Sequence, residues 1–434
     1  MNKYQSYKPS GVEWIGDIPL NWSLKRICFV FRPISIKNNI GEINLSVYRD
    51  YGVIPTDSRD DNHNTISEDT SNYKLVQVGD FVMNKMKCWM GSLGLSDYRG
   101  IVSPSYTVMR PINNENRKYL HYLLRSQLYI PQYRRLSYGV RIGQWDMRFE
   151  DFRDLPCVIP PLQEQLQIVQ FLDEKTELID KLISTKERKI TLLKEQRTSL
   201  INEVVTKGLN PNVKMKDSGV EWIGEIPEGW KITKLKYLVT FDSGYSFNSS
   251  DYVDEGVNLI RIGSLYDNTL DLERSPVFLP IQFLNQHQNF VVKKNDILIS
   301  LTGTLGKRDY GYSIVYDKDF PSLLNQRVGR LKLKSEDLNF KLFTSILHSE
   351  YYLNQLFCKP TGTKQGNFSS DDIISNYIFL PPNQEQHQIV EYLDSKTKEI
   401  DDLVQLEQKK IDLLKEYRQS LISEVVTGKV KVTQ

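Results

Sequence analysis

The sequence has few cysteines and no long apolar run. Its 434 residues include only four cysteines, Cys28, Cys88, Cys157 and Cys358, which are scattered and form no CxxC pair. This spacing argues against a disulfide framework and favours reduced thiols. No apolar run approaches the roughly 18–20 residues that span a bilayer. The polar first residues also lack the apolar stretch of a secretory signal. We therefore expect a soluble, cytoplasmic protein that does not bind a membrane.

An excess of charge of one sign is also missing. The chain has 56 lysines and arginines against 54 aspartates and glutamates, a formal net charge of +2. Any nucleic-acid surface must therefore come from the distribution of basic residues rather than from bulk charge. The same balance keeps open a scaffold or adaptor protein whose variable segments bind other proteins.

Catalytic signatures are missing as well. An adenine methyltransferase needs a glycine-rich cofactor loop and an Asn/Asp-Pro-Pro-aromatic segment, but the two Pro-Pro pairs precede Leu162 and Asn383. The segment 303–307 is too short for a phosphate-binding loop and is typical of a turn between strands. Asp80 and Asp296 are expected to close turns. The five histidines show no metal-ligand spacing. We predict no catalytic residue and no metal site in this chain.

Two segments occur twice. Ser10–Trp22 (SGVEWIGDIPLNW) returns as Ser218–Trp230 (SGVEWIGEIPEGW), with ten of thirteen positions identical. Pro160–Thr206 returns as Pro381–Thr427, with 29 of 47 positions identical. Each half opens with one repeat and closes with the other, while the inserts between them look almost unrelated. A constant frame around variable inserts predicts two binding domains held in one fixed geometry.

Each 47-residue repeat predicts one long helix. A Pro-Pro pair suits the first turn, and no further proline or glycine occurs before Gly208 and Gly428, which suit helix caps. Apolar residues at spacings of three and four form a coiled-coil seam. The predicted seam residues are Leu172, Ile179, Ile183, Lys186, Ile190, Leu193 and Leu200 in the first repeat, and Leu393, Ile400, Val404, Glu407, Ile411, Leu414 and Leu421 in the second.

The polar seam positions favour antiparallel pairing of the two helices within one chain. That arrangement brings Thr176 near Arg418, and Arg197 near Thr397. It also sets Lys186 opposite Glu407. A parallel register would bring two arginines together, which costs free energy.

The inserts combine helical and strand patterns. Segments 290–300 and 77–83 each predict a turn followed by a short strand, and segments 118–128 and 339–356 predict helices. The predicted fold class is α+β, with two mixed α/β domains separated by two long antiparallel coiled-coil helices and related by a pseudo-twofold axis. The predicted boundaries are 1–159 and 209–380 for the domains, and 160–208 and 381–430 for the helices.

Basic, amide and aromatic residues gather near the end of each insert. Arginine can bind phosphate or guanine, and glutamine and asparagine can bind adenine. Taken alone, each stretch is also compatible with an ordinary polar loop. The candidate DNA-binding residues are Lys85, Lys87, Arg134, Arg135, Arg141, Gln144 and Arg148 in the first half, and Lys307, Arg308, Gln326, Arg327, Lys359, Thr363, Lys364, Gln365 and Asn367 in the second.

The SGVEWIGxIPxxW opening, the PPxxEQxxIVxxLD helix start and the two-half repeat resemble the specificity subunit of type I restriction–modification enzymes. The resemblance covers essentially the whole chain. It implies two target-recognition domains, each reading one half of a split DNA site, separated by two antiparallel helices. With two unlike inserts the site should be asymmetric, its halves about one turn of DNA apart (~34 Å).

The same resemblance implies a subunit without catalytic activity or cofactor of its own. Its expected partners are double-stranded DNA, two modification subunits that methylate adenine, and, in systems that also cut DNA, two motor-nuclease restriction subunits. S-adenosylmethionine, ATP and Mg²⁺ are expected in those partner subunits. The base-contacting residues do not transfer from the family, because the inserts are where its members differ.

Overall fold

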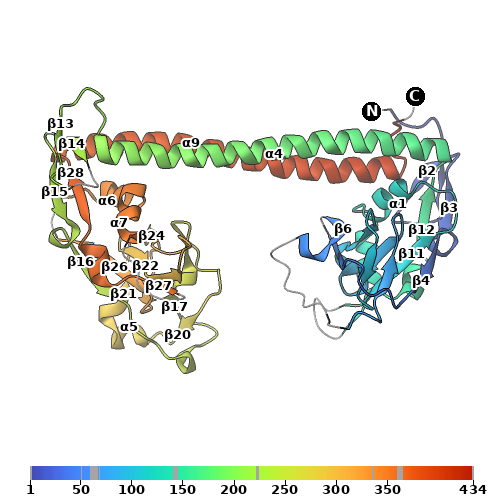
Figure 1. Cartoon of the computed structure of the whole chain (residues 1–434), viewed down its shortest axis with the longest axis horizontal. Coiled ribbons are helices and arrows are strands. Elements are labelled where there is room, and N and C mark those ends of the chain that lie inside the picture. The colour runs from blue at the N-terminus through green and yellow to red at the C-terminus, as the bar shows by residue number, and fades with distance from the viewer. Residues whose placement is uncertain are drawn as a thin grey trace. The chain divides into compact units, whose positions relative to one another are not determined.

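The computed structural model describes residues 2–49, 51–58, 67, 69–139, 145–220, 224–334, 337–358 and 365–432. The chain divides into two compact units. Unit 1 comprises Met1–Glu187 and Gln408–Gln434, and unit 2 comprises Arg188–Glu407. Each unit therefore contains one insert, part of the first long helix and part of the second (Figure 1).

The described residues of unit 1 form mainly short strands and short α-helices. Its strands are β1 (Tyr7–Pro9), β2 (Asp17–Pro19), β3 (Ser23–Arg26), β4 (Phe31–Ile34), β5 (Leu45–Tyr48), β6 (Gly52–Pro55), β7 (Lys74–Val76), β8 (Phe81–Asn84), β9 (Leu93–Leu95), β10 (Gly100–Val102), β11 (Tyr106–Pro111) and β12 (Pro156–Ile159). Its short helices are α1 (Arg117–Leu124), α2 (Ile130–Leu136) and α3 (Phe149–Phe152), with a 3-10 helix, η3, at Lys85–Met90.

Unit 2 has the same mixture of elements. Its strands are β13 (Met215–Asp217), β14 (Glu225–Pro227), β15 (Lys231–Lys234), β16 (Val239–Ser243), β17 (Val257–Ile260), β18 (Leu265–Tyr266), β19 (Thr269–Leu270), β20 (Phe278–Leu279), β21 (Val291–Val292), β22 (Ile297–Ser300), β23 (Thr302–Thr304), β24 (Ser313–Val315), β25 (Ser322–Leu324), β26 (Val328–Leu333), β27 (Gln365–Asn367) and β28 (Tyr377–Leu380). Its helices are α5 (Phe283–Gln286), α6 (Phe340–Leu347), α7 (Glu350–Phe357) and α8 (Ser370–Ile374).

An antiparallel four-stranded sheet lies at the centre of each unit. The strand order is β4-β11-β8-β9 in unit 1 and β16-β26-β22-β24 in unit 2. Successive residues of strands β8 and β22 pack into two different hydrophobic cores. In β8, Phe81 belongs to one core and Val82 to another. In β22, Ile297 and Leu298 are divided in the same way. Both faces of each sheet are therefore covered, which explains why these strands are apolar at consecutive positions.

The turn before each central strand is closed by an aspartate, as predicted. Asp80 Oδ2 accepts a hydrogen bond from the Gln77 backbone at 2.9 Å, and Asp296 Oδ2 accepts one from Lys293 at 2.9 Å. Asp80 also pairs with Arg110 of β11 at 2.7 Å. Asp296 pairs with an arginine of β26 at 3.6 Å, so two inserts of unlike sequence share one local construction.

The short-helix predictions were wrong in two details. The helix predicted over 118–128 ends at Leu124, because the chain turns at the buried Ser126, whose N–H bonds to the Leu123 carbonyl at 3.1 Å. The single helix predicted over 339–356 is divided into α6 and α7. Ser349 divides it by capping α7, its side chain accepting from the Tyr352 backbone at 3.3 Å.

The two repeats form the long helices α4 (Leu162–Lys207) and α9 (Asn383–Val426). Gly208 and Gly428 follow them with φ of 76° and 74°, the left-handed conformation in which glycine commonly ends a helix. None of the helices formed by the described residues combines the length and apolar content that a membrane crossing needs.

Within each unit the two long helices run antiparallel. In unit 1, Asp180 of α4 pairs with Arg418 of α9 at 3.0 Å. In unit 2, Arg197 pairs with Asp401 at 3.0 Å. The aspartates lie one helical turn beyond the threonines expected near these arginines. The two ion pairs are equivalent by the repeat. Arg197 and Arg418 occupy the same position of the 47-residue repeat, and so do Asp180 and Asp401.

Glu407 is the most buried charged residue of the predicted seam. Its side chain is 3% exposed and pairs with Lys189 Nζ at 3.0 Å, both in unit 2. A buried carboxylate without a cation is costly, so this pair constrains the register of the helices there.

The seam residues show two levels of exposure. The buried residues are Leu172, Ile179, Leu393, Ile400, Glu407, Ile411 and Leu421, and the half-buried residues are Ile183, Lys186, Ile190, Leu193, Leu200, Val404 and Leu414. Neighbouring positions such as Leu192 and Leu413 are more than half exposed, at 54% and 55%. A single apolar stripe on each helix therefore carries most of the packing.

This difference predicts unequal effects of aspartate at adjacent positions. Leu193→Asp should lower the free energy of unfolding by about 2–3 kcal/mol, because it places a charge in the packed stripe. Leu192→Asp, the matched control, should change it by no more than about 0.5 kcal/mol. Chemical denaturation of the full chain measures both. Equal effects would show that the predicted stripe is not where the helices pack.

A half-buried histidine, His121, predicts acid sensitivity. Burial, together with nearby Arg125 and Lys118, lowers the pKa of His121 to about 3, and its Nδ1 accepts from the Leu95 backbone at 3.0 Å. The folded pKa lies below the ordinary value of 6.5, so the stabilisation is complete above pH 6.5 and is lost as pH falls toward 3.

Between pH 7.5 and 5.0, the wild-type chain should lose about 2 kcal/mol more free energy of unfolding than His121→Gln, whose amide does not titrate. Denaturant titrations at the two pH values make the comparison. Parallel losses in the two proteins would mean that His121 is not held neutral by the fold.

Candidate nucleic-acid interface

The two repeated segments of each half meet at a buried tryptophan. Trp22 Nε1 donates to Glu164 Oε2 at 2.9 Å in unit 1, and Trp230 Nε1 donates to Glu385 Oε2 at 2.9 Å in unit 2. Both indoles are at most 1% exposed. The last residue of the opening motif therefore binds the glutamate of the helix start, which gives a physical reason for both segments to occur in both halves. We call each contact a clamp.

The glutamine after each glutamate extends the clamp to the insert. Gln165 Oε1 accepts from the Asn116 backbone at 2.7 Å, where Asn116 caps α1. Gln386 Oε1 accepts from the Asn339 backbone at 2.8 Å, where Asn339 caps α6. The start of one long helix thus also holds one helix of the insert in place, α1 in unit 1 and α6 in unit 2.

The end of the other long helix packs on the same tryptophan. A Cβ added at Gly428 would lie 3.1 Å from the Trp22 ring and 2.4 Å from Pro19. A Cβ added at Gly208 would lie 3.2 Å from the Trp230 ring. Within each unit, the indole therefore lies between the start of one long helix and the end of the other.

Two of the candidate residues of the first half, Arg134 and Arg148, lie over aromatic rings. Helix η3 carries Lys85 and Lys87, and helix α2, which packs against η3, carries Arg134 and Arg135. Arg148 directly precedes α3. Arg141 and Gln144 lie outside the described residues. The Arg134 guanidinium lies 5.8 Å from the ring of Trp145, which contacts Trp89 at 5.2 Å. Arg148 lies 4.9 Å over Tyr138. We call Arg134, Arg135 and Arg148, together with Trp89, Tyr138 and Trp145, the unit 1 cluster. It is both cationic and aromatic.

The candidate residues of the second half are less uniform. Three of them are exposed, namely Lys307, Gln326 and Arg327. The Asn367 side chain accepts a hydrogen bond from the Thr302 hydroxyl at 2.9 Å across the β23–β27 pair. Only the backbone of Gln365 is described, and Lys359, Thr363 and Lys364 lie outside the described residues. Arg308 is held by Glu350 and Asn354 of α7, each at 2.7 Å. Its guanidinium is therefore already paired within unit 2.

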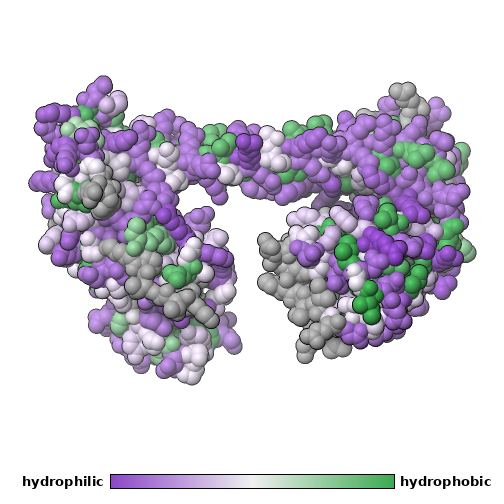
Figure 2. Space-filling model, viewed as in Figure 1, coloured by the Kyte–Doolittle hydropathy of each residue, from purple (hydrophilic) through white to green (hydrophobic). Residues whose placement is uncertain are grey.

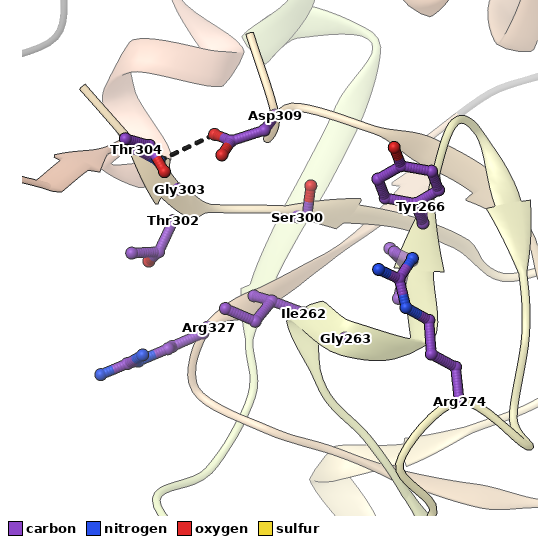
Figure 3. Close-up of a pocket in the computed structure, with 11 residues that line it drawn as sticks. Ile262, Gly263, Tyr266, Arg274, Ser300, Thr302, Gly303, Thr304, Asp309 and Arg327 are labelled. Atoms are coloured by element: carbon purple, nitrogen blue, oxygen red, sulfur yellow. Dashed lines mark hydrogen bonds between the residues drawn. The ribbon is translucent and has the colours of Figure 1, made fainter. Parts of the chain in front are cut away.

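A hollow in unit 2 contains polar residues that the sequence did not single out. It encloses about 590 Å³ and is lined by Arg274, Tyr266, Ser300, Thr304 and Asp309, together with the predicted Arg327 (Figure 3). Arg274 lies 4.3 Å over the Tyr266 ring. No motif surrounds Arg274 in the sequence, since its position depends on how β18 and β19 fold back on the sheet.

The chain matches the family described as "Type I restriction modification DNA specificity domain" over residues 28–192 and 227–420. It is 31% identical to the MjaVIII specificity subunit of Methanocaldococcus jannaschii over 65% of this chain, and it spans 63% of that relative's length. It is 26% identical to the putative MjaX specificity subunit of the same organism, over 96% of both chains.

A solved structure has a similar fold. It comes from work on complex assembly and conformational transition of the type I R-M system. Its TM-score is 0.68 at 18% identity, and the alignment covers 95% of this chain and 99% of that chain. The family match extends over both halves, and with the α+β construction of the two units it shows that this chain belongs to the family of type I restriction–modification specificity subunits.

Proposed function

We propose that the chain is the non-catalytic specificity subunit of a type I restriction–modification complex in the cytoplasm, and that each unit reads one half of an asymmetric, bipartite DNA site. The observation that carries this proposal is that both units have the same clamp and the same central sheet beneath unlike surface residues. A shared frame with different reading residues suits two unlike half-sites. S-adenosylmethionine, ATP and Mg²⁺ would then belong to the partner subunits.

The unit 1 cluster supports contact with DNA. Arginines bind phosphate and guanine, and indoles offer flat apolar faces beside them. The exposed Arg134 guanidinium lies 5.8 Å from the centre of the Trp145 ring and forms no ion pair with any described residue. A chain with a net charge of only +2 can still bind DNA through such a local concentration.

The long helices are proposed to set the spacing of the half-sites and to dock two modification subunits. The visible face of these helices is mostly hydrophilic with separate apolar patches (Figure 2). Leu182 and Leu403 occupy equivalent positions of the repeat, and each is 42% exposed. Leu192 and Leu413 form a second equivalent pair and are 54% and 55% exposed. Exposed leucines that recur at equivalent positions suit two copies of one partner.

Exchange of an insert tests the proposal. Replacing residues 23–155 with the corresponding insert of a relative keeps Trp22 and Glu164, so the clamp remains. In cells that also make the modification subunits, single-molecule sequencing of methylated DNA should show one half of the motif changed. The other half and the gap between the halves should stay the same. A swap that alters both halves, or neither, would contradict the assignment of one half-site to each unit.

Loss of the cluster arginines should weaken DNA binding in a salt-dependent way. For each phosphate contact removed by Arg134→Ala or Arg135→Ala, the slope of log affinity against log salt should decrease in magnitude by about 0.9. A base-reading arginine should instead relax the motif at one position, at about 1–3 kcal/mol. Salt titrations of the chain assembled with its modification subunits, on cognate and mismatched duplexes, separate these roles.

Arg26→Ala is the control, since Arg26 is exposed and already pairs with Asp154 at 3.6 Å. Its slope and affinity should match the wild type. Unchanged slope and affinity in both cluster variants would return Arg134 and Arg135 to an ordinary polar surface.

A further inference from the structure

Each unit has a polar hollow at the same place in the fold. In unit 2 it lies beyond the end of β22, before the start of β26 and against the segment that follows β17 (Figure 3). In unit 1 a hollow of about 300 Å³ lies beyond the end of β8, before the start of β11 and against β5. The strands correspond one to one in the two sheets. Unlike inserts thus keep a recess in one position of a shared fold.

The linings of the two hollows differ in chemistry. The unit 1 hollow has amide and hydroxyl groups, including Asn44, Ser46, Asn84 and Ser105, with Lys87 as its cation. The unit 2 hollow is lined by two arginines, of which Arg274 points its guanidinium inward and Arg327 points away, together with hydroxyls and one carboxylate. Those are the differences expected of two sites that select different ligands of one class.

The guanidinium N–H groups of the two arginines that line the unit 2 hollow, Arg274 and Arg327, are not bound to a carboxylate of the described residues. By contrast, Arg308 nearby is bound by Glu350, and Arg330 of β26 pairs with Asp242 at 2.8 Å. Figure 3 shows Arg274 reaching into the hollow beneath Tyr266, whereas Arg327 extends away from it.

Stacking on Tyr266 prepares Arg274 for planar recognition. At 4.3 Å from the ring, the guanidinium is held over a flat surface, which restricts its side chain and leaves its edge as the donor face. A guanidinium edge matches the O6 and N7 acceptors of guanine. A mobile arginine would lose more entropy on binding the same base.

The carboxylate in the hollow argues for a base edge rather than a phosphate. Asp309 Oδ1 accepts from the Thr304 backbone at 2.8 Å, so its negative charge is fixed in the recess. A phosphate at this place would meet that charge, whereas the amino group of cytosine could donate to it. The combination of arginine donors with one carboxylate therefore fits the exposed edge of a base pair that contains guanine.

We propose that the two matched hollows are the base-reading pockets of this protein, and that the unit 2 hollow reads a guanine-containing pair, with Arg274 as its main specificity-determining residue. The unit 1 hollow reads its half-site through amide and hydroxyl groups. The proposal rests on the function proposed above, because it identifies where each unit reads its half-site.

The test is the methylated motif of single-residue variants of unit 2. Arg274→Ala should relax the second half of the motif at one guanine position, reducing discrimination there about 5- to 150-fold, and should leave the first half unchanged. Tyr266→Leu should relax the same position to a smaller extent. Lys294→Ala is the charge-matched control, since Lys294 precedes the opposite end of β22 and pairs with Asp319 at 2.6 Å. Its motif should equal the wild-type motif.

An unchanged motif in Arg274→Ala, with or without weaker methylation overall, would overturn the assignment of the hollow as a reading pocket. Relaxation of the first half of the motif would also overturn it. The wild-type chain tests the proposed function separately. If it directs no bipartite motif, that function fails, whereas a wild-type motif that the hollow variants leave intact contradicts the pocket assignment alone.

Discussion

The hydrogen bond from a buried indole to a glutamate at the start of a long helix is the contact on which each unit depends. Trp22 and Trp230 are buried, and each donates to its glutamate at 2.9 Å. A hydrogen bond to a charged group contributes about 1.5–3 kcal/mol, and removal of one partner leaves a buried polar group unpaired. The same indole packs against the glycine that follows the other long helix, so one residue joins two helix ends.

This arrangement separates the parts of the chain that must stay constant from those that can vary. The clamp uses the opening motif and the helix start, whereas the inserts contribute the central sheets and the surfaces above them. Matching aspartates close the turns before β8 and β22, so part of the insert is constrained as well. What remains free to change is the lining of the hollows and the outer residues. That division suits a protein proposed to change its DNA target without changing its frame.

The sequence was most informative where the determinants are local. The bounds of α4 and α9 follow from prolines, glycines and an uninterrupted helical period, and the two turn aspartates follow from their own positions. Local pattern failed at Ser349, where a capping hydroxyl divides an apolar helical stretch that has no glycine or proline. Propensity over the window favoured one helix, but the cap and the turn favoured two.

Contacts between distant segments were beyond the reach of pattern alone. Both partners of each clamp lie in repeated motifs, but nothing in the spacing shows that residue 22 meets residue 164. Arg274 is a stronger case, because its place beside Tyr266 and opposite Ser300 depends on the fold of the whole insert. In the same way, the pairing of Arg308 with Glu350 depends on the tertiary fold and has no signal in the local sequence. Whether a charge is available for a ligand is decided by tertiary neighbours.

Two units that read unlike half-sites from one frame would give a distinctive pattern of methylation. This pattern is tested most directly by single-molecule sequencing of methylated DNA from cells that carry this chain and its modification subunits, compared with cells from which the chain is deleted. We expect one motif that disappears on deletion and consists of two unlike specified halves separated by a gap of fixed length. A continuous motif, or a palindrome with two identical halves, would contradict it.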